Sequence, residues 1–410
     1  MKKVKLIQLF LMSSLSLALN SYAADKEVTT EAPAAQEFLV GTWTGGVPDG
    51  LGALKPVLNS QGIYRVRLNA DGTMLPINQL KLENPSWLAF SKDKQFIYAT
   101  NEDNGDKEGK VSALKFTKSG DLQLLNKVKS HGQQPTHAEV SPDNKFLLIS
   151  NYSSRPNHAG VTVFPIKKDG SLGKLAQKVA FIKGSQVLPD RQADGHAHST
   201  TFSPDGSVAY VADLGSDLIK AYHYDADAKQ PLKPAPELDL QFPEGSGPRH
   251  LVFSKIGNYL YATTEMDAQV IVFKKEYNQY KIIQSQNLTD QDDPEAKGGA
   301  GLIFSPDQKF LYVGNRKKVN EIVAYAVDSK TGKLTLIDRY PIGGIEPRAF
   351  DIDETGEYLV VANVFSNTVS QFKRDLKTGK LKPTQIALQI GLPTDVKFVP
   401  SQYVSKATAK

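Results

Sequence analysis

The strongest constraint on this chain is a unit that occurs seven times: a short apolar run, a turn and a second apolar run. Its clearest copies read PTHAEVSPDNKFLLISNY, HSTTFSPDGSVAYVADLG and PRHLVFSKIGNYLYATTE. The turn position is filled, in chain order, by Ser91, Ser141, Ser203, Ser254, Ser305, Asp353 and Val399. Successive intervals are 50, 62, 51, 51, 48 and 46 residues. A period near fifty with strand-type content predicts an all-β propeller, with one four-stranded blade per repeat.

Each repeat offers four strand signals. In the repeat that begins at Pro85 they are SWLAF, QFIYATN, KVSALKF and LQLLNKV, rich in β-branched and aromatic residues. The first two are joined in several copies by Ser-Pro-Asp, where proline fixes φ and Ser and Asp bond the local backbone. We therefore expect tight hairpins.

The ends of the chain predict how the ring closes. After Pro393 one strand remains, TDVKFV, and before the first complete repeat stand three, EFLVGTW, GIYRVRL and LPINQLKL. One plus three makes a complete blade, which would remove exposed sheet edges. We predict a seven-bladed β-propeller over residues 37–400, with the C-terminal strand innermost in the shared blade.

The first 23 residues have the pattern of a secretory signal. Lys2, Lys3 and Lys5 precede an apolar stretch at residues 6–19, and Ser21-Tyr22-Ala23 provides small residues for cleavage after Ala23. A retained anchor is the alternative. We expect a signal peptide at 1–23, a flexible leader at 24–36, a polar tail at 401–410, and a periplasmic or secreted protein.

Charge and cysteine content exclude several classes. The signal contains three of the lysines, so the formal charge falls from +5 to 46 − 44 = +2 without it. A nearly neutral chain gives no sign of a nucleic-acid partner. With no cysteine, neither disulfides nor thiol chemistry contribute. We expect one domain, a monomer, and no membrane association after cleavage.

When the repeats are aligned, polar and charged residues that differ from copy to copy fall at one position, five residues before each turn. Its occupants are Ser86, Thr136, His198, Arg249, Ala300, Arg348 and Thr394. Two and four residues further on the occupants are mostly apolar, so the two-residue strand period predicts one face that is polar at its mouth and buried below. His137, His250 and Trp87 follow this position directly, and we expect them on the opposite face, packed within or between blades.

The antiparallel second strand ends at the same level. Eleven residues after the turn stand Glu102, Tyr152, Leu214, Glu265, Arg316 and Val364. Arg249 and Glu265 should therefore be neighbours, with His198, Arg316 and Arg348 converging from blades alongside. Clustered arginines repel one another and usually hold an anion, carboxylate or phosphate. An inter-blade ion-pair network of Arg249, Arg316, Glu265 and Glu102 is the alternative.

His196 and His198 stand two apart and could both ligate a metal, but no third ligand is evident nearby in sequence, so we predict no metal and no cofactor. The sequence holds no Gly-x-Ser-x-Gly elbow, His-Glu-x-x-His pair or P-loop. The long 62-residue interval comes from an insertion at about residues 183–195, which we expect to overhang the mouth.

Six segments together resemble one family, the seven-bladed propeller lactonases, over residues 38–400. They are HAHSTTFSPDG, DLGSDLIKAY, GPRHLVF, TTEM, LYVGNR and EPRAFDID. This family includes the propeller-type 6-phosphogluconolactonases and the fungal carboxy-muconate cyclase. The resemblance implies active-site residues at His198, Arg249, Glu265 and Arg316. One departure is Thr264-Glu265, where the family usually has Asn-Glu.

The predicted function is hydrolysis of a sugar-acid or related anionic lactone. His198 and Glu265 would form the acid/base pair and Arg249 would stabilise the oxyanion. Substrate contacts are expected from Arg316, Arg348, Glu102, Tyr152 and His196. Two alternatives stay open: a lactonising muconate cycloisomerase, and an exported binding or scaffold propeller without catalysis.

Overall fold

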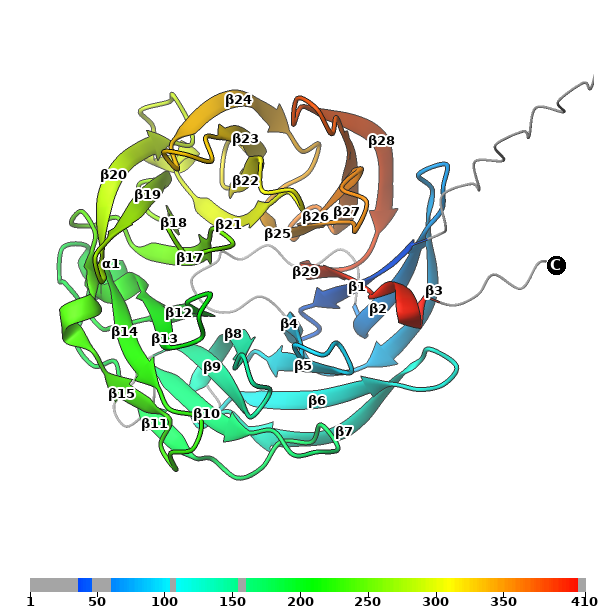
Figure 1. The fold of residues 1–410 in the computed structure, drawn as a ribbon. Helices are drawn as coiled ribbons and strands as arrows, with labels where there is room; N and C mark the ends of the chain where they lie inside the picture. Colours follow the sequence, from blue (N-terminus) through cyan, green and yellow to red (C-terminus); the bar gives the residue numbers. More distant parts are fainter. Residues whose placement is uncertain (1–35, 46–59, 104–107, 154–159, 405–410) are drawn as a thin grey trace, which may run out of the picture. The chain divides into compact units, whose positions relative to one another are not determined.

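The computed structural model describes residues 36–45, 60–103, 108–153 and 160–404. Over this range the chain forms seven antiparallel sheets around one axis (Figure 1). The predicted signal peptide, nearly all of the predicted leader and the last six residues lie outside the described residues.

In chain order, the first four sheets contain these strands. The sheet shared by the two termini has β1 (Gln36–Thr42), β2 (Gly62–Leu68), β3 (Met74–Lys81) and β29 (Pro393–Phe398). The next has β4 (Pro85–Phe90), β5 (Phe96–Asn101), β6 (Lys110–Phe116) and β7 (Leu122–Lys129). The third has β8 (Gln133–Val140), β9 (Phe146–Ser153), β10 (Val161–Pro165) and β11 (Gln177–Val179). The fourth has β12 (Ala197–Phe202), β13 (Val208–Asp213), β14 (Leu218–Tyr224), β15 (Leu232–Pro234) and β16 (Leu240–Gln241).

The remaining three sheets have four strands each. They are β17 (Pro248–Phe253), β18 (Tyr259–Thr264), β19 (Gln269–Glu276) and β20 (Gln279–Asn287); β21 (Gly299–Phe304), β22 (Phe310–Asn315), β23 (Glu321–Val327) and β24 (Leu334–Pro341); and β25 (Pro347–Ile352), β26 (Tyr358–Asn363), β27 (Thr368–Arg374) and β28 (Leu381–Gln389). The α-helix α1 (Pro189–Gln192) lies in the predicted insertion. Four 3-10 turns complete the described structure: η1 (Leu214–Ser216), η2 (Pro236–Leu238), η3 (Pro294–Ala296) and η4 (Ser401–Tyr403).

The ring closes as predicted. The strand order of the shared sheet is β29-β1-β2-β3, with Phe38 opposite Phe398 and Val40 opposite Val396. Innermost strands contact one another in a cycle that runs β29, β4, β8, β12, β17, β21, β25 and back to β29. The seven-bladed β-propeller is therefore confirmed, and each innermost strand has a neighbour on both sides.

The predicted hairpins between first and second strands owe their shape to the turn serine. In the third sheet Ser141 Oγ donates to Asp143 Oδ1 at 2.6 Å and accepts the Phe146 N–H at 2.9 Å. The residue after the aspartate, Asn144, has φ of 60°, a left-handed conformation that Asn and Gly tolerate best. The hydroxyl thus closes the turn as the sequence predicted.

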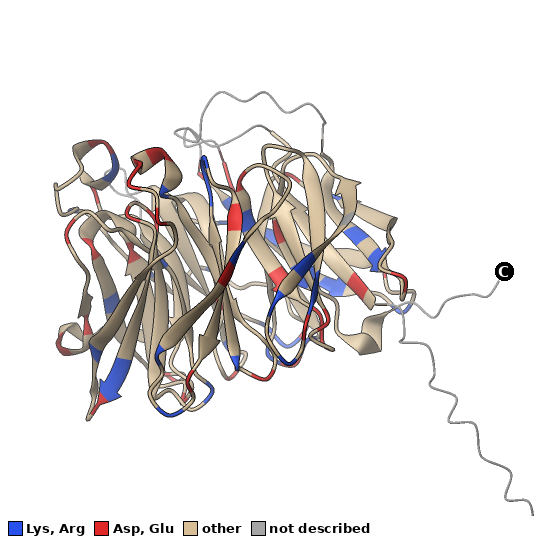
Figure 2. Cartoon of the chain, turned by 90° about the horizontal axis from the view of Figure 1, so that it is seen from above, with Lys and Arg blue, Asp and Glu red and all other residues tan. Residues whose placement is uncertain are grey.

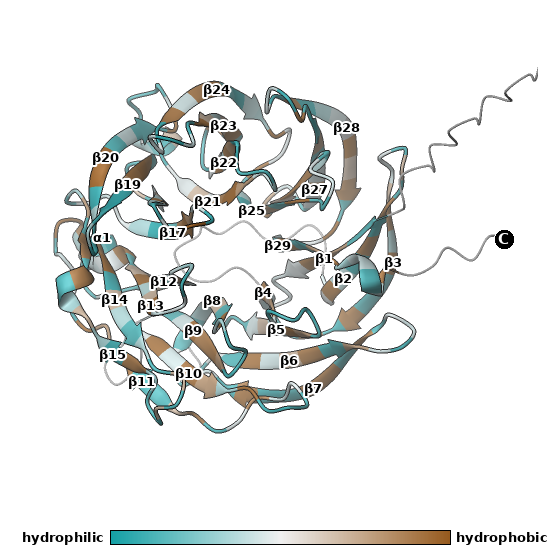
Figure 3. Cartoon of the chain, in the orientation of Figure 1, coloured by the Kyte–Doolittle hydropathy of each residue, from teal (hydrophilic) through white to brown (hydrophobic). Residues whose placement is uncertain are grey.

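Apolar side chains pack mainly between sheets. Seven of the hydrophobic clusters each join two neighbouring blades, one cluster for every interface around the ring. Buried tyrosines on second strands add a directed bond: Tyr261 Oη donates to the Gly332 carbonyl at 2.7 Å, and Tyr312 Oη to the Gly379 carbonyl at 2.8 Å. Both glycines lie in the turns before fourth strands, and Figure 3 shows such loops as hydrophilic beside hydrophobic strand segments.

A β-bulge at the start of every innermost strand corrects one prediction. Register shifts occur at this level in all seven, for instance between Pro248 and His250, so Arg249 is the extra residue. A bulge breaks the two-residue alternation. His250 therefore does not lie on the opposite face: its ring lies 5.1 Å from that of His198 and 5.2 Å from that of Trp87, three blades away. Such a contact is possible only across the axial channel.

Charged residues of both signs are interspersed over the blades (Figure 2). Among the residues that the structure describes, no helix has the length and apolar character needed to cross a membrane.

Candidate active site

The centre of the site is the predicted Arg249–Glu265 pair. Arg249 stands at the bulge of β17, and Glu265 follows directly after β18, so the hairpin brings both to one end of the channel. Arg249 Nε donates to Glu265 Oε2 at 2.8 Å. Both side chains are buried.

Arg316 approaches the same carboxylate from the neighbouring blade. Its Nη2 lies 3.0 Å from Glu265 Oε2, and its Nη1 lies 2.8 Å from Glu346 Oε1. Its Nε and Nη2 also donate to the carbonyls of Gly298 and Gly299, each at 3.2 Å. Because most of its donors are engaged, Arg316 fixes Glu265 in place and has little capacity left for a substrate anion.

A third arginine comes from the insertion. Arg191, in α1, donates from Nη2 to Glu265 Oε1 at 2.5 Å and to Tyr152 Oη at 3.1 Å. The insertion thus reaches the mouth, as expected, but the contribution of Arg191 was not predicted.

These contacts determine the charge on both partners. Burial alone would raise the pKa of Glu265, but Arg316, Arg191 and Arg249 outweigh it and hold that pKa well below its usual range. Burial and the neighbouring Arg316 lower the pKa of Arg249 to about 9. At neutral pH the site therefore contains an ionised carboxylate beneath protonated guanidinium groups.

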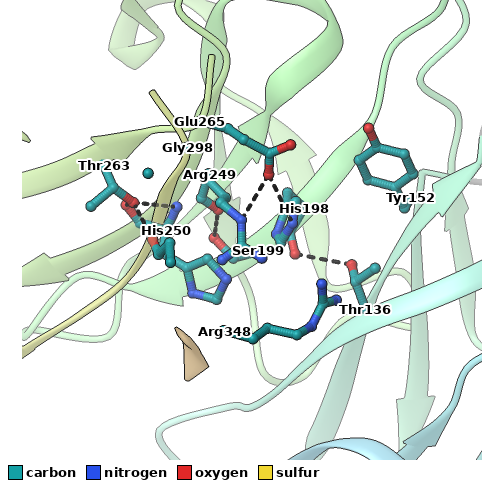
Figure 4. A network of polar contacts seen from close by, with 12 residues as sticks. Thr136, Tyr152, His198, Ser199, Arg249, His250, Thr263, Glu265, Gly298 and Arg348 are labelled. Atoms are coloured by element: carbon teal, nitrogen blue, oxygen red, sulfur yellow. Dashed lines mark hydrogen bonds and ion pairs between the residues drawn. The ribbon is translucent and has the colours of Figure 1, made fainter. Parts of the chain in front are cut away.

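His198 projects from the bulge of β12 toward this pair (Figure 4). Its Nε2 lies 3.9 Å from Glu265 Oε2, too far for a hydrogen bond. Burial, with Arg249 next, lowers the pKa of His198 well below its usual range, so the imidazole is neutral at neutral pH. Its Nδ1 is buried without a partner among the described residues.

Arg348 and Glu102 form the other side of the mouth. The closest approach between them, Nη2 to Oε2, is 3.9 Å, and the Arg348 guanidinium lies 4.7 Å above the Trp43 ring. Glu102 Oε2 accepts the Trp43 Nε1–H at 2.9 Å. Burial raises the pKa of Glu102. The structure contains no hydrogen bond from Arg348 to any described residue, so its donors are available.

Tyr152 and His196 support one another beside His198. Their rings stack with centroids 4.5 Å apart, and His196 Nδ1 lies 2.7 Å from the Tyr152 carbonyl oxygen. The Tyr152 ring stands edge-on to that of His198 at 5.8 Å. Within the described ranges no group of three or more His, Cys, Asp or Glu side chains could hold a metal ion.

A cavity of about 750 Å³ opens beside the cluster. Arg191, Glu265, Arg316 and Glu346 from the cluster line it. Its other lining residues are the apolar Ile345 and Phe365 and the charged Asp293, Glu295, Lys317 and Lys318. It is large enough for a sugar-sized molecule.

Sequence alignment of the repeats found most of the cluster but missed several members. His137, His250 and Trp87 were assigned to the wrong face because a bulge cannot be seen in the residue types. Trp43 stands in the shared blade at the position that Glu102 occupies in the next one, since Thr42 pairs with Pro393 as Asn101 pairs with Pro85, but the N-terminal strand was not aligned with the other repeats. Arg191 lies in the insertion, outside the repeat positions. Its one available signal was the extra length of the insertion, which pointed to the segment but not to the residue.

The comparisons with known proteins decide the family. The family model described as "Lactonase, 7-bladed beta-propeller" matches residues 37–398. The chain belongs to the seven-bladed β-propeller lactonase family. The resemblance seen in the sequence is therefore confirmed, and the class of chemistry is that of a hydrolase acting on lactone esters.

Individual relatives agree. A protein of Formosa agariphila named 6-phosphogluconolactonase is 33% identical over 301 residues, which is 73% of this chain and 84% of the relative. One of the same name from Bacillus subtilis is 31% identical over 371 residues, 88% of this chain and 97% of the relative. The solved structure of the periplasmic gluconolactonase PpgL of Pseudomonas aeruginosa superimposes with a TM-score of 0.82 at 35% identity, covering 90% of this chain and 99% of that one.

Proposed function

We propose that this lactonase hydrolyses a sugar-acid or related anionic lactone at the mouth formed by His198, Arg249, Glu265 and Arg348. The observation that carries the proposal is the set of unused polar groups there. Arg348 makes no hydrogen bond to a described residue, and His198 Nδ1 and Thr394 Oγ1 are buried without partners. Buried polar groups in native proteins are nearly always satisfied, so these favour a polar ligand at the mouth.

The protonation states of His198 and Arg249 determine the catalytic role that we propose for each. Neutral His198 accepts a proton from water as the water oxygen attacks the lactone carbonyl carbon. Protonated Arg249 stabilises the oxyanion that forms on the carbonyl oxygen. When the tetrahedral intermediate collapses, the bond from the carbonyl carbon to the ring oxygen breaks. The ring oxygen then takes the proton back from His198, which leaves an open-chain hydroxy acid.

The role proposed for Glu265 differs from the sequence prediction, which paired it with His198 for acid/base catalysis. A carboxylate held ionised by three guanidinium groups has no proton to give at neutral pH. We propose that it stabilises the imidazolium of His198 during the reaction and orients Arg249. Arg348, with free donors, binds a carboxylate, phosphate or hydroxyl oxygen of the substrate, whereas Arg316 positions Glu265.

We also propose that the protein is exported. The predicted cleavage after Ala23 lies outside the described residues, and the support comes from the similarity to a protein named periplasmic gluconolactonase. A periplasmic or secreted monomer acting on a small lactone remains our prediction.

The test is lactone hydrolysis by purified protein, followed by acid release at constant pH, on gluconolactone and on 6-phosphogluconolactone. We expect turnover well above the spontaneous rate, and losses of about 10²-fold or more for His198→Gln and Arg249→Met. Arg348→Met should raise KM more than it lowers kcat. A wild-type rate equal to the spontaneous one on both lactones would overturn the proposal.

A further inference from the structure

We infer that Arg191 is a positioning residue for Glu265, carried into the active site by the insertion at residues 183–195; this rests on the role proposed for Glu265 above. Through this one residue, the insertion would then influence the geometry of the active site.

The base of the insertion is fixed to the propeller. Gln192, next to Arg191, is fully buried, and its Nε2 donates to Asp217 Oδ1 at 2.8 Å and to the Leu214 carbonyl at 3.1 Å. The Ser185 N–H donates to the Gly215 carbonyl at 2.8 Å. Arg191 therefore extends toward the mouth from an anchored point.

Arg191 holds the oxygen of Glu265 that the other arginines leave. Arg249 and Arg316 both contact Oε2, whereas Arg191 contacts Oε1. A carboxylate held at both oxygens cannot rotate, and Oε2 then stays on the side that faces His198. Loss of Arg191 would release one end of this restraint.

The same guanidinium also connects two blades. Its second bond goes to Tyr152, in β9 of the third blade, whereas Glu265 follows β18 of the fifth blade. Tyr152 stacks on His196 and stands against His198. Arg191 thus sets the distance across the mouth between the carboxylate and the aromatic wall beside His198.

Exposure separates Arg191 from the other two arginines. Its side chain is 41% exposed, against 2% for Arg249 and 5% for Arg316, so it lies at the solvent side of Glu265 and lines the cavity. Its charge is partly screened there. We therefore expect the loss of Arg191 to change the orientation of the Glu265 carboxylate strongly and the electrostatic stabilisation of that carboxylate moderately.

A pH profile separates these two effects. The groups facing Glu265 are Arg249 from β17, Arg316 after β22, Arg191 from α1, His198 from β12 and, beyond Arg316, Glu346. Removing one of the three cations raises the pKa of Glu265 toward its usual range. Activity that needs the ionised carboxylate is then lost at a higher pH on the acid side.

The experiment compares wild type, Arg191→Ala, Arg191→Lys and Glu265→Gln in kcat and KM from acid to neutral pH. We expect Arg191→Ala to lower kcat by about 10- to 100-fold with a smaller change in KM. We also expect it to shift the acid limb of the pH–activity profile, where activity falls as the pH drops, to higher pH. Arg191→Lys should restore the position of the limb but only part of kcat, because an ammonium cannot bridge two acceptors as a guanidinium fork does.

Asp190→Asn provides the matched control, since this exposed neighbour in α1 should leave kcat, KM and the limb unchanged. Thermal unfolding of each variant shows whether the fold is intact, and the lysine variant serves if the alanine variant does not fold. An Arg191→Ala enzyme with wild-type kcat and pH limb, beside an inactive Glu265→Gln enzyme, would overturn the inference alone. A fully active Glu265→Gln enzyme would overturn the proposed role of Glu265 as well.

Discussion

At the scale of single residues, the axial channel is unusual for the histidines it encloses. His137, His198 and His250 are all buried and come from three blades. Burial, reinforced by Lys397 and Arg249, lowers the pKa of His137 to about 3, and burial lowers those of His198 and His250 well below the usual range. The folded protein thus keeps neutral three groups that become charged on unfolding in mild acid.

This difference predicts an acid-sensitive stability. An unfolded histidine binds a proton below about pH 6.5, whereas the folded one does not, so stability falls as pH drops through 6.5 toward the folded pKa. Between pH 7.5 and 5 we expect the free energy of unfolding to fall by roughly 2 kcal/mol for His137 alone. Urea unfolding at several pH values measures it, and His137→Gln should show a smaller fall. A free energy that stays constant over this range would contradict the explanation.

At the scale of elements, each blade is joined to the next by an apolar cluster and by directed hydrogen bonds. Thr136 Oγ1 donates to the His198 carbonyl at 3.1 Å, and Ser199 Oγ to the Arg249 carbonyl at 2.7 Å. Both bonds run between innermost strands at the level of the site. The bulges that turn His198 and Arg249 toward the mouth are therefore held by neighbouring blades.

The buried tyrosine bonds allow a test of this blade-to-blade stabilisation. Tyr261→Phe removes the hydroxyl that satisfies the Gly332 carbonyl and should cost about 1 kcal/mol of unfolding free energy, because a buried acceptor loses its partner. Tyr277→Phe is the control, since Tyr277 is fully exposed and should be neutral. Chemical unfolding of both variants gives the difference. Equal stability would show that another group satisfies Gly332.

At the scale of the whole molecule, stability depends on closing the ring. β29 pairs with β1 and packs beside β25 and β4, so it takes part in two of the inter-blade interfaces. Asp395 Oδ2 accepts the Leu88 N–H at 2.8 Å, and Asp351 Oδ2 accepts the Phe398 N–H at 2.9 Å. These bonds join the last strand to the blades on each side.

A chain that ends before Pro393 should therefore not reach the native state. It would leave β1 as an unpaired edge beside exposed apolar surface, which favours aggregation. We expect the truncated protein to elute as aggregate and a peptide of residues 393–404, added during refolding, to restore soluble, active protein. Gel filtration with an activity assay measures both. A soluble, active truncated chain would contradict this view of closure.

The sequence by itself determined the period, the number of blades, the closing strand and the level at which polar residues depart from the repeat. These follow from local pattern, because strand alternation, turn residues and spacing are properties of neighbouring residues. His198, Arg249, Glu265 and Arg316 were placed together in this way. Within one blade the Arg249–Glu265 pair was predicted, but the contacts between charges of different blades were not, since distances between blades depend on packing.

Only the tertiary structure decided which face the channel residues occupy and which residue of the insertion enters the site. One extra residue in a bulge moved His250 from the expected interior of a blade into the channel, because the hydrogen-bond register between strands sets the alternation. Arg191 reaches Glu265 because the insertion is anchored to a neighbouring turn through long-range contacts. Local sequence pattern does not reveal such long-range contacts.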